Sequence, residues 1–300
     1  MNRLPGGLLF GLIVTLQGIP SGAQVVVTFR SMEDSIRTYR DSIRKAGEDT
    51  TRITLGKAVE GMMLRTCALP GAFTLPFDSL NSMERSESPD GGFRIFTWDI
   101  PMTTGQYRYY GVIQWNGDKF PDRKPVSLSD LTDSIPLPET TLLDAMHWFG
   151  ALYYKIIAEP YAGGTVYTLL GWKGMDFQLT CKVIEILSFD ERGRPRFGMK
   201  LFPGYQEGKN VRVIFRFSSQ TSMALRYEEQ LYTPSANPEQ KKAASRKKKT
   251  RMIICDRLVP LSAGQEGMYR FYIPAGDTYD AFLFGQDGWQ FLPGVDARNR

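Results

Sequence analysis

The sequence predicts a mainly β protein, made of antiparallel sheets arranged as a sandwich or a propeller-like array and preceded by a pair of helices. Two observations lead to this fold class. Apolar residues recur at helical spacing early in the chain and alternate from about residue 73 onward. Turns rich in glycine, proline and aspartate then separate many short aromatic and β-branched runs, which is typical of all-β folds. We therefore expect a signal peptide over 1–23, a helical segment over 24–72 and an antiparallel β domain over 73–300.

Residues 1–23 have the pattern of a secretory signal peptide. Arg3 provides a short positive region, residues 8–16 form an apolar core, and small residues precede a cleavage site after Ala23. A membrane anchor is the alternative, but it needs about 20 apolar residues, and glycine and proline interrupt this stretch. We therefore expect a periplasmic or secreted protein with no membrane-spanning segment after cleavage.

Two helices are expected at the start of the mature chain. The first begins near Ser31 and ends near Gly47, and the second begins near Asp49 and ends before Pro70. Spacings of three and four define the apolar faces, with Met32, Ile36, Tyr39 and Ile43 in the first helix and Leu55, Val59, Met62 and Met63 in the second. The charged residues expected on the solvent face of the first helix are Arg37, Arg40, Asp41 and Arg44.

The β domain contains runs with the two-residue period of strands. In residues 211–219, apolar residues alternate with Arg212 and Arg216, which predicts a strand with one buried and one solvated face. Residues 182–190 are apolar on both faces and are expected to form a central strand, whose partner follows the turn at 191–195. Further strands are expected within 88–100, 106–115, 152–159, 165–172, 221–229, 251–259, 268–274 and 280–292.

A third helix is expected to interrupt these strands over 138–155, because apolar residues recur there every three or four positions. This segment contains the single histidine of the chain, His147, among apolar neighbours. A catalytic histidine needs a nucleophile and an orienting group beside it, and the sequence indicates neither. We therefore expect a structural role for His147.

No other catalytic or metal-binding motif occurs. The chain has no phosphate-binding glycine loop, and Cys67, Cys181 and Cys255 lack the spacing of metal ligands, so we expect buried cysteines of which at most one pair forms a disulfide. The sequence thus indicates no cofactor, no metal and no enzymatic activity. A glycoside hydrolase is the open alternative, because its two carboxylates need no fixed spacing in the sequence.

The net charge of +5 comes from one basic run. We expect a loop over 238–251 to carry it, and without this run and the signal peptide the chain is mildly acidic. The basic residues are Lys241, Lys242, Arg246, Lys247, Lys248, Lys249 and Arg251. Such blocks are usually solvated tips, and contact with an anionic surface, such as lipopolysaccharide phosphates, is the alternative. No aromatic residue lies among these charges, so nucleic-acid binding is not expected.

Trp115, Trp172 and Trp289 each occur where an aromatic strand meets a glycine turn. Together with Tyr227 they are the candidate ligand-binding residues, because aromatic faces at strand ends can stack on a ligand. The alternative is that each tryptophan closes the core at the end of its strand, with its N–H bonded to a nearby carbonyl. Their spacing also fits a repeated sheet unit.

Five short motifs occur in the later part of the chain, namely YTLLGWKG, KVIEILSFDERGRPRFG, ALRYEE, YIPAGDTYDAFLF and VDARN. In these motifs the chain, from about residue 73 to 299, resembles a family of exported proteins from Bacteroidota-type bacteria to which no function is assigned. The resemblance implies residence in the periplasm or on the outer surface and no particular activity. Lys173 and Arg257 depart from the acid or amide and the histidine that the family pattern implies, which argues against a metal site built on these positions.

The sequence as a whole predicts an exported, non-catalytic envelope protein that binds a protein or a glycan. The alternatives are an envelope glycoside hydrolase that uses a carboxylate pair and a protein that contacts anionic surfaces through residues 241–251.

Overall fold

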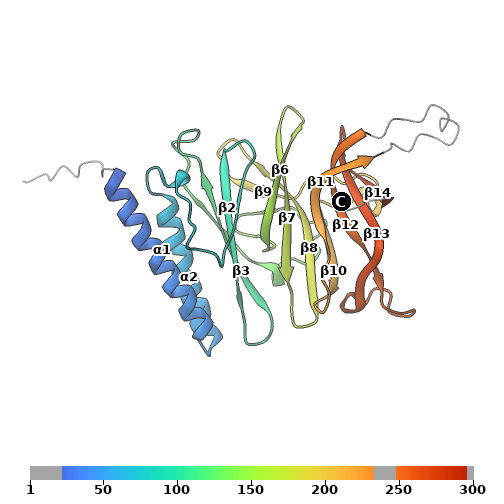
Figure 1. Cartoon of the computed structure of the whole chain (residues 1–300), viewed down its shortest axis with the longest axis horizontal. Helices are drawn as coiled ribbons and strands as arrows, with labels where there is room; N and C mark the ends of the chain where they lie inside the picture. Colours follow the sequence, from blue (N-terminus) through green and yellow to red (C-terminus); the bar gives the residue numbers. More distant parts are fainter. Residues whose placement is uncertain (1–21, 233–247, 296–300) are drawn as a thin grey trace, which may run out of the picture.

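The computed structural model describes residues 22–232 and 248–295. Two helices are followed by three antiparallel sheets, so the described part of the chain is mainly β, as predicted (Figure 1). The predicted signal peptide, apart from its last two residues, and residues 241–247 of the basic run lie outside the described residues.

The helical pair consists of α1 (Gly22–Lys45) and α2 (Asp49–Cys67), which confirms the two predicted helices. The expected start of the first helix near Ser31 is wrong, because α1 begins at Gly22 and Ser31 lies inside it, where its carbonyl oxygen accepts from the Ser35 hydroxyl at 2.8 Å. Within the described residues, neither these nor any other helix is long and apolar enough to cross a membrane. The buried stripe of α1 differs from the expected one, because Tyr39 is 38% exposed and Arg40 only 8%. The expectation of a solvated Arg40 is wrong, since its guanidinium donates to the carbonyl oxygens of Asp99 and Ser82 at 2.9 and 2.8 Å.

The first sheet has the order β1-β2-β3-β4. Its strands are β1 (Glu84–Glu87), β2 (Phe93–Pro101), β3 (Tyr107–Trp115) and β4 (Val126–Ser129). Both faces of β2 are apolar, because Phe93 and Ile95 point toward the second sheet while Phe96 and Trp98 point toward the helices. A strand with two apolar faces is typical of a sheet that is covered on both sides.

The second sheet has the order β5-β9-β8-β7-β6, and β10 pairs with the other half of β8. Its strands are β5 (Leu143–Asp144), β6 (Leu152–Tyr161), β7 (Gly164–Gly174), β8 (Leu179–Phe189), β9 (Pro195–Phe197) and β10 (Arg212–Ser218). The predicted central strand is therefore β8, with β9 as its partner after the predicted turn.

The predicted helix over 138–155 is wrong. This segment forms a loop, the short strand β5, a turn and the start of β6. The Asp144 carboxylate accepts hydrogen bonds from the backbone N–H groups of Met146 and His147 at 2.9 Å each, and Gly150 has a positive φ of 71°. Asx turns and left-handed glycines both end a helical path. The apolar residues do not share one helix face, because Trp148, Phe149 and Tyr153 are buried between the first and second sheets whereas Leu142 and Met146 are exposed.

The third sheet has the order β11-β12-β13-β14. Its strands are β11 (Leu225–Tyr232), β12 (Lys248–Pro260), β13 (Tyr272–Gly285) and β14 (Gly288–Val295). Strand β12 begins at Lys248, so the last four residues of the loop expected over 238–251 belong to a strand. In the described part of the basic run, Lys249 forms an ion pair with Glu229 of β11 at 3.1 Å.

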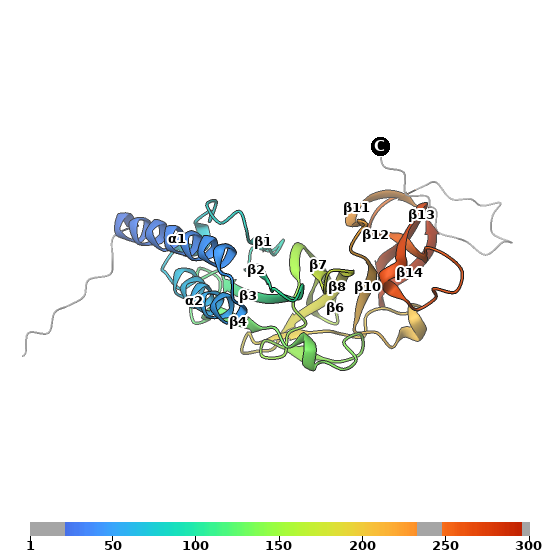
Figure 2. The ribbon, with the colours of Figure 1, turned by 90° about the horizontal axis from the view of Figure 1, so that it is seen from below.

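The layers are stacked in chain order, from the helices through the first and second sheets to the third sheet (Figures 1 and 2). One apolar core fills each of the three spaces between successive layers. All three cysteines are buried and free, as expected, and each lies in a different core, with Cys67 nearest the helices, Cys181 in the middle and Cys255 beside the third sheet. The packing therefore keeps the three thiols in separate layers.

A buried ion pair fixes β10 on β8. Arg212 and Glu185 are both 0% exposed, and the Arg212 Nε donates to the Glu185 carboxylate at 2.7 Å. The predicted solvated face of β10 is therefore wrong at Arg212, because the loop before β5 covers it. The remaining donors of the guanidinium reach the carbonyl oxygens of Pro138, of Thr141 at 2.8 Å and of Phe197 at 3.3 Å.

Replacing Glu185 by leucine should lower the free energy of unfolding by about 3–5 kcal/mol, because it leaves the Arg212 guanidinium buried without its anion. The double variant Glu185→Leu/Arg212→Met should lose less, because no buried charge then remains unpaired. Urea unfolding followed by circular dichroism measures both losses. If the single variant does not fold while the double variant does, the same conclusion holds, namely that the unpaired buried charge is costly. Equal losses of unfolding free energy in the two variants would contradict it.

Candidate functional site

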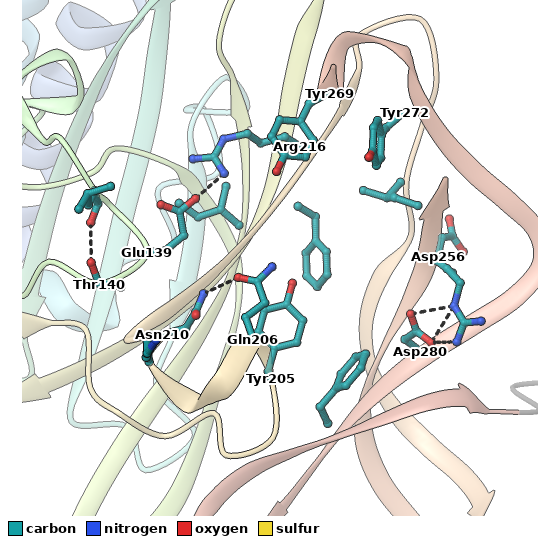
Figure 3. Close-up of a pocket in the computed structure, with 17 residues that line it drawn as sticks. Glu139, Thr140, Tyr205, Gln206, Asn210, Arg216, Asp256, Tyr269, Tyr272 and Asp280 are labelled. Atoms are coloured by element: carbon teal, nitrogen blue, oxygen red, sulfur yellow. Dashed lines mark hydrogen bonds and ion pairs between the residues drawn. The ribbon is translucent and has the colours of Figure 1, made fainter. Parts of the chain in front are cut away.

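A cleft of about 510 Å³ opens between the second and third sheets. We call it the interlayer cleft. Figure 3 shows its labelled side chains around an open space, with Glu139 and Arg216 on one side and Asp256 and Asp280 on the other. Residues from six segments line it: Leu137, Glu139 and Thr140, then Tyr205, Gln206, Lys209 and Asn210, then Ile214 to Arg216, then Asp256 to Leu258, then Tyr269, Tyr272 and Asp280, and finally Phe291.

The wall on the side of the second sheet depends on the buried Arg212. Its guanidinium binds the carbonyl oxygens of Pro138 and Thr141, and the backbone N–H of Val211 donates to the carbonyl oxygen of Glu139 at 2.8 Å. These bonds hold the segment 137–141 against β10. The Glu139 carboxylate therefore lies beside Arg216 of β10 and accepts a hydrogen bond from its guanidinium.

An irregular strand pairing builds the opposite wall. Asp256, Arg257 and Leu258 are consecutive in β12 and all line the cleft, although neighbours in a regular strand point to opposite faces. The register between β12 and β13 shifts between Asp256 and Leu258, and such a bulge changes the direction of side chains. Arg257 consequently reaches the carboxylate of Asp280, to which its Nε donates at 3.1 and 3.2 Å.

The carboxylates of this wall are held by further hydrogen bonds. The Asp280 carboxylate also accepts from the backbone N–H of Gly294 at 2.9 Å, and the Asp256 carboxylate accepts from the backbone N–H of Ala224 at 2.7 Å. Side-chain exposure falls from 37% at Arg257 to 13% at Asp280. The planar Arg257 guanidinium is therefore the more exposed group of the pair, and the less exposed Asp280 carboxylate holds it in position.

Aromatic side chains form the rest of the lining. Tyr269 is 45% exposed, and its ring centroid lies 5.2 Å from that of Tyr272 and 5.8 Å from the Arg216 guanidinium carbon. Tyr205 packs against Phe291 with centroids 5.1 Å apart. Burial raises the pKa of the Tyr205 hydroxyl, so it remains a neutral hydrogen-bonding group. Tyr269 is thus the most exposed ring of the lining, and the Arg216 guanidinium lies over it.

Strained backbone places an amide at the rim. Gln206 and Glu207 have φ values of 42° and 64°, which non-glycine residues rarely adopt, and such outliers cluster at functional sites. The Gln206 side-chain oxygen accepts from the amide nitrogen of Asn210 at 3.3 Å. The two amides thereby form a linked donor and acceptor pair on the cleft wall.

The charges of the cleft balance, because three basic residues face three acidic residues. The basic residues are Lys209, Arg216 and Arg257, and the acidic ones are Glu139, Asp256 and Asp280. His147 does not line this cleft, and no cluster of three or more metal-ligating side chains occurs in the described residues. The arrangement combines aromatic faces with planar hydrogen-bonding groups, which suits an uncharged ligand that has both apolar faces and hydroxyl groups.

The four predicted ligand-binding aromatics lie outside this cleft and in more than one layer. Trp289 is fully buried, its Nε1 donates to the Thr168 hydroxyl at 2.8 Å, and the ring of Tyr227 packs on it at 6.2 Å. The Tyr227 hydroxyl donates to the Glu159 carboxylate at 3.2 Å. Both residues therefore belong to the core between the second and third sheets.

The other two tryptophans lie elsewhere. Trp115 is 6% exposed between the first and second sheets, where its ring lies 4.5 Å from that of Phe189 and 4.4 Å from the Arg123 guanidinium. Trp172 is half-buried and packs edge-on against Tyr107 at 5.9 Å. The structure does not bring the three tryptophans together in one groove.

Arg257, which departs from the family pattern, lies in the cleft. Glu139, Tyr205, Gln206 and Tyr269 were not predicted as site residues. Each of them lies in a loop or a short turn, and the segments that meet in the cleft are separated by long stretches of sequence. The one signal present in the sequence was the outward position of Arg216 in an alternating strand.

Lys173, the second departure, is buried between the first and second sheets. It is 2% exposed, and its Nζ donates to the Thr132 hydroxyl at 2.9 Å and the Phe149 carbonyl at 2.8 Å and lies 4.1 Å from the Tyr109 ring centroid. Burial lowers the pKa of Lys173 to about 8, and nearby Asp130 only partly offsets this effect. The Nζ group thus forms two hydrogen bonds and lies over the Tyr109 and Phe149 rings, so Lys173 fastens β7 to the loop around Thr132.

Comparison of this chain with models of known protein families, with curated proteins and with solved structures finds no match.

The buried Lys173 predicts a specific pH dependence of stability. Above a folded-state pKa of about 8 the native lysine is neutral, whereas the unfolded lysine stays charged up to 10.5, so the unfolded state binds more protons in this window. Relative to a Lys173→Met variant, the wild type should therefore gain about 2 kcal/mol of unfolding free energy between pH 7 and pH 9.5. Urea unfolding at several pH values measures the difference.

The matched control is Lys57→Met, because Lys57 is exposed on α2. Its stability difference from the wild type should stay constant over the same pH range. If the difference in unfolding free energy between Lys173→Met and the wild type were equally constant, the buried lysine would not lose its proton at a lower pH than the unfolded lysine.

Proposed function

We propose that this chain is an exported, non-catalytic protein of a bacterial envelope and that the interlayer cleft binds an uncharged carbohydrate. The observation that carries the proposal is the open ring of Tyr269 beside Arg216, opposite the Arg257–Asp280 pair. The predicted signal peptide and the resemblance to exported Bacteroidota-type proteins support the location.

Carbohydrate is the chemical class that uses this set of groups. One face of a hexose ring carries C–H groups and packs on an aromatic ring, while the hydroxyl groups at its edge both donate and accept hydrogen bonds. The cleft offers the Tyr269 face together with guanidinium donors, carboxylate acceptors and the Gln206 amide. Its volume of about 510 Å³ falls within the range of small-molecule sites, roughly 300–1,000 Å³.

The ion pairs favour binding over hydrolysis. A glycoside hydrolase needs one carboxylic acid that carries a proton toward the leaving oxygen. In the cleft, Glu139 accepts a hydrogen bond from Arg216 and Asp280 accepts from Arg257, so each of these carboxylates faces a guanidinium instead of the open space where a leaving oxygen would lie. The third acid, Asp256, is oriented toward the backbone of Ala224. The carboxylates therefore serve to orient arginines and to accept hydrogen bonds from ligand hydroxyls.

A glycan array of envelope polysaccharides and their oligosaccharides, probed with the purified protein, should identify a neutral ligand. Tyr269→Ala should then weaken its binding about tenfold, because the variant loses the stacking face, and tenfold corresponds to about 1.4 kcal/mol. Gln206→Gly should weaken binding without loss of stability, because glycine suits the positive φ at this position. Isothermal titration calorimetry measures both effects.

Phe177→Ala is the matched control, because Phe177 is an aromatic residue that is 71% exposed and lies outside the cleft. Its affinity should equal that of the wild type. If Tyr269→Ala binds with unchanged affinity, the ligand does not bind in this cleft. If the protein releases reducing ends from the bound glycan, its function is hydrolysis rather than binding.

A further inference from the structure

A second cavity, of about 620 Å³, lies beside β5 and β9, and we call it the β9 cavity. It shares only Thr140 with the interlayer cleft, because the segment from Leu137 to Leu142 runs between the two. Its lining divides into an apolar floor and a basic rim, and neither part takes a role in the proposed glycan site.

The floor of the β9 cavity is built from the core of the second sheet. Leu143, Phe197 and Val211 are between 0% and 6% exposed and line the cavity together with the half-buried Met199. Leu142 completes this apolar surface at the mouth, where it is 67% exposed. A large aliphatic side chain left open beside an apolar hollow is typical of a binding site.

The rim of the β9 cavity carries unpaired positive charge. Arg196 and Lys200 line it, both are exposed, and neither forms an ion pair with any described residue. The one acidic residue of the lining is Asp144, whose carboxylate accepts hydrogen bonds at 2.9 Å from the backbone N–H groups of Met146 and His147. The same carboxylate lies 3.0 Å from the His147 Nδ1. Asp144 is the cross-strand partner of Arg196, but its carboxylate forms no ion pair with either cation and is bonded within its own turn.

We infer that the β9 cavity binds a single-chain amphiphile with an anionic headgroup. The alkyl chain lies on the floor formed by Leu142, Phe197 and Met199, and the headgroup meets Arg196 and Lys200 at the rim. Charge complementarity selects an anionic head over a neutral or cationic one. The volume of the cavity, about 620 Å³, falls in the range of small-molecule sites. A stable protein partner would instead cover roughly 800 Å² of the protein surface.

The experiment uses isothermal titration calorimetry of the purified protein with three dodecyl amphiphiles, each below its critical micelle concentration. Dodecyl phosphate should bind at one site about tenfold more tightly than octaethylene glycol dodecyl ether, whose neutral head contains no sugar, and dodecyltrimethylammonium should bind more weakly than both. Shortening the chain to decyl phosphate should weaken binding up to about fourfold for each methylene removed, because each buried methylene contributes to burial of apolar area. Inorganic phosphate alone should bind far more weakly than dodecyl phosphate.

Two variants separate the rim from the floor. Arg196→Gln/Lys200→Gln should reduce dodecyl phosphate affinity to that of octaethylene glycol dodecyl ether and leave the affinity for the ether unchanged. Leu142→Ser should weaken the binding of both about fivefold. The matched controls are Arg192→Gln/Lys57→Gln and Leu261→Ser, which change exposed residues of the same types outside both cavities and should bind like the wild type.

The replaced residues are exposed, so circular dichroism and the melting temperature should match those of the wild type. Absence of saturable dodecyl phosphate binding, equal affinity for octaethylene glycol dodecyl ether, or a headgroup preference that survives in Arg196→Gln/Lys200→Gln would each overturn the inference. Equal affinity for inorganic phosphate would also overturn it and would indicate an anion site without a chain-binding floor. None of these results depends on glycan binding in the interlayer cleft.

Discussion

The guanidinium of Arg212 is buried with no contact with water, and its donors must all find acceptors inside the protein. It obtains them from the Glu185 carboxylate, from the end of β9 at Phe197 and from the carbonyls of Pro138 and Thr141. One side chain thus joins two strands of the second sheet to the segment in front of β5. That segment separates the two cavities, so the shape of both depends on the satisfaction of one buried charge.

The stacking of layers creates this requirement. Cores lie on both faces of the first two sheets, so a polar side chain that points into one of these cores is cut off from solvent. Arg40, Lys173 and Arg212 show the same solution, in which carbonyl oxygens of irregular segments accept from a buried cation. Such bonds position loops as firmly as strand pairing positions strands, and the cavities are formed where these loops meet sheet edges.

The two cavities differ in chemistry in a way that separates their proposed ligands. The interlayer cleft has balanced charges and an open tyrosine face, whereas the β9 cavity has an aliphatic floor and two cations without ion-pair partners in the described residues. A glycan and an anionic amphiphile are both constituents of bacterial envelopes, which agrees with the export predicted from the first 23 residues. The segment from Leu137 to Leu142 lies between the two proposed sites.

The sequence by itself determined the mainly β class, the helical pair and the positions of most strands, because hydrophobic periodicity and turn residues are local properties of the chain. It did not determine which charged residues are buried, and Arg40 and Arg212 were wrongly expected in solvent because their acceptors lie far away in sequence. The same dependence on distant contacts produced the false helix over 138–155, because Trp148, Phe149 and Tyr153 are buried between the first and second sheets while Leu142 and Met146 are exposed. The interlayer cleft was decided by tertiary structure alone, since the layers bring together loop residues whose local patterns carry no common signal.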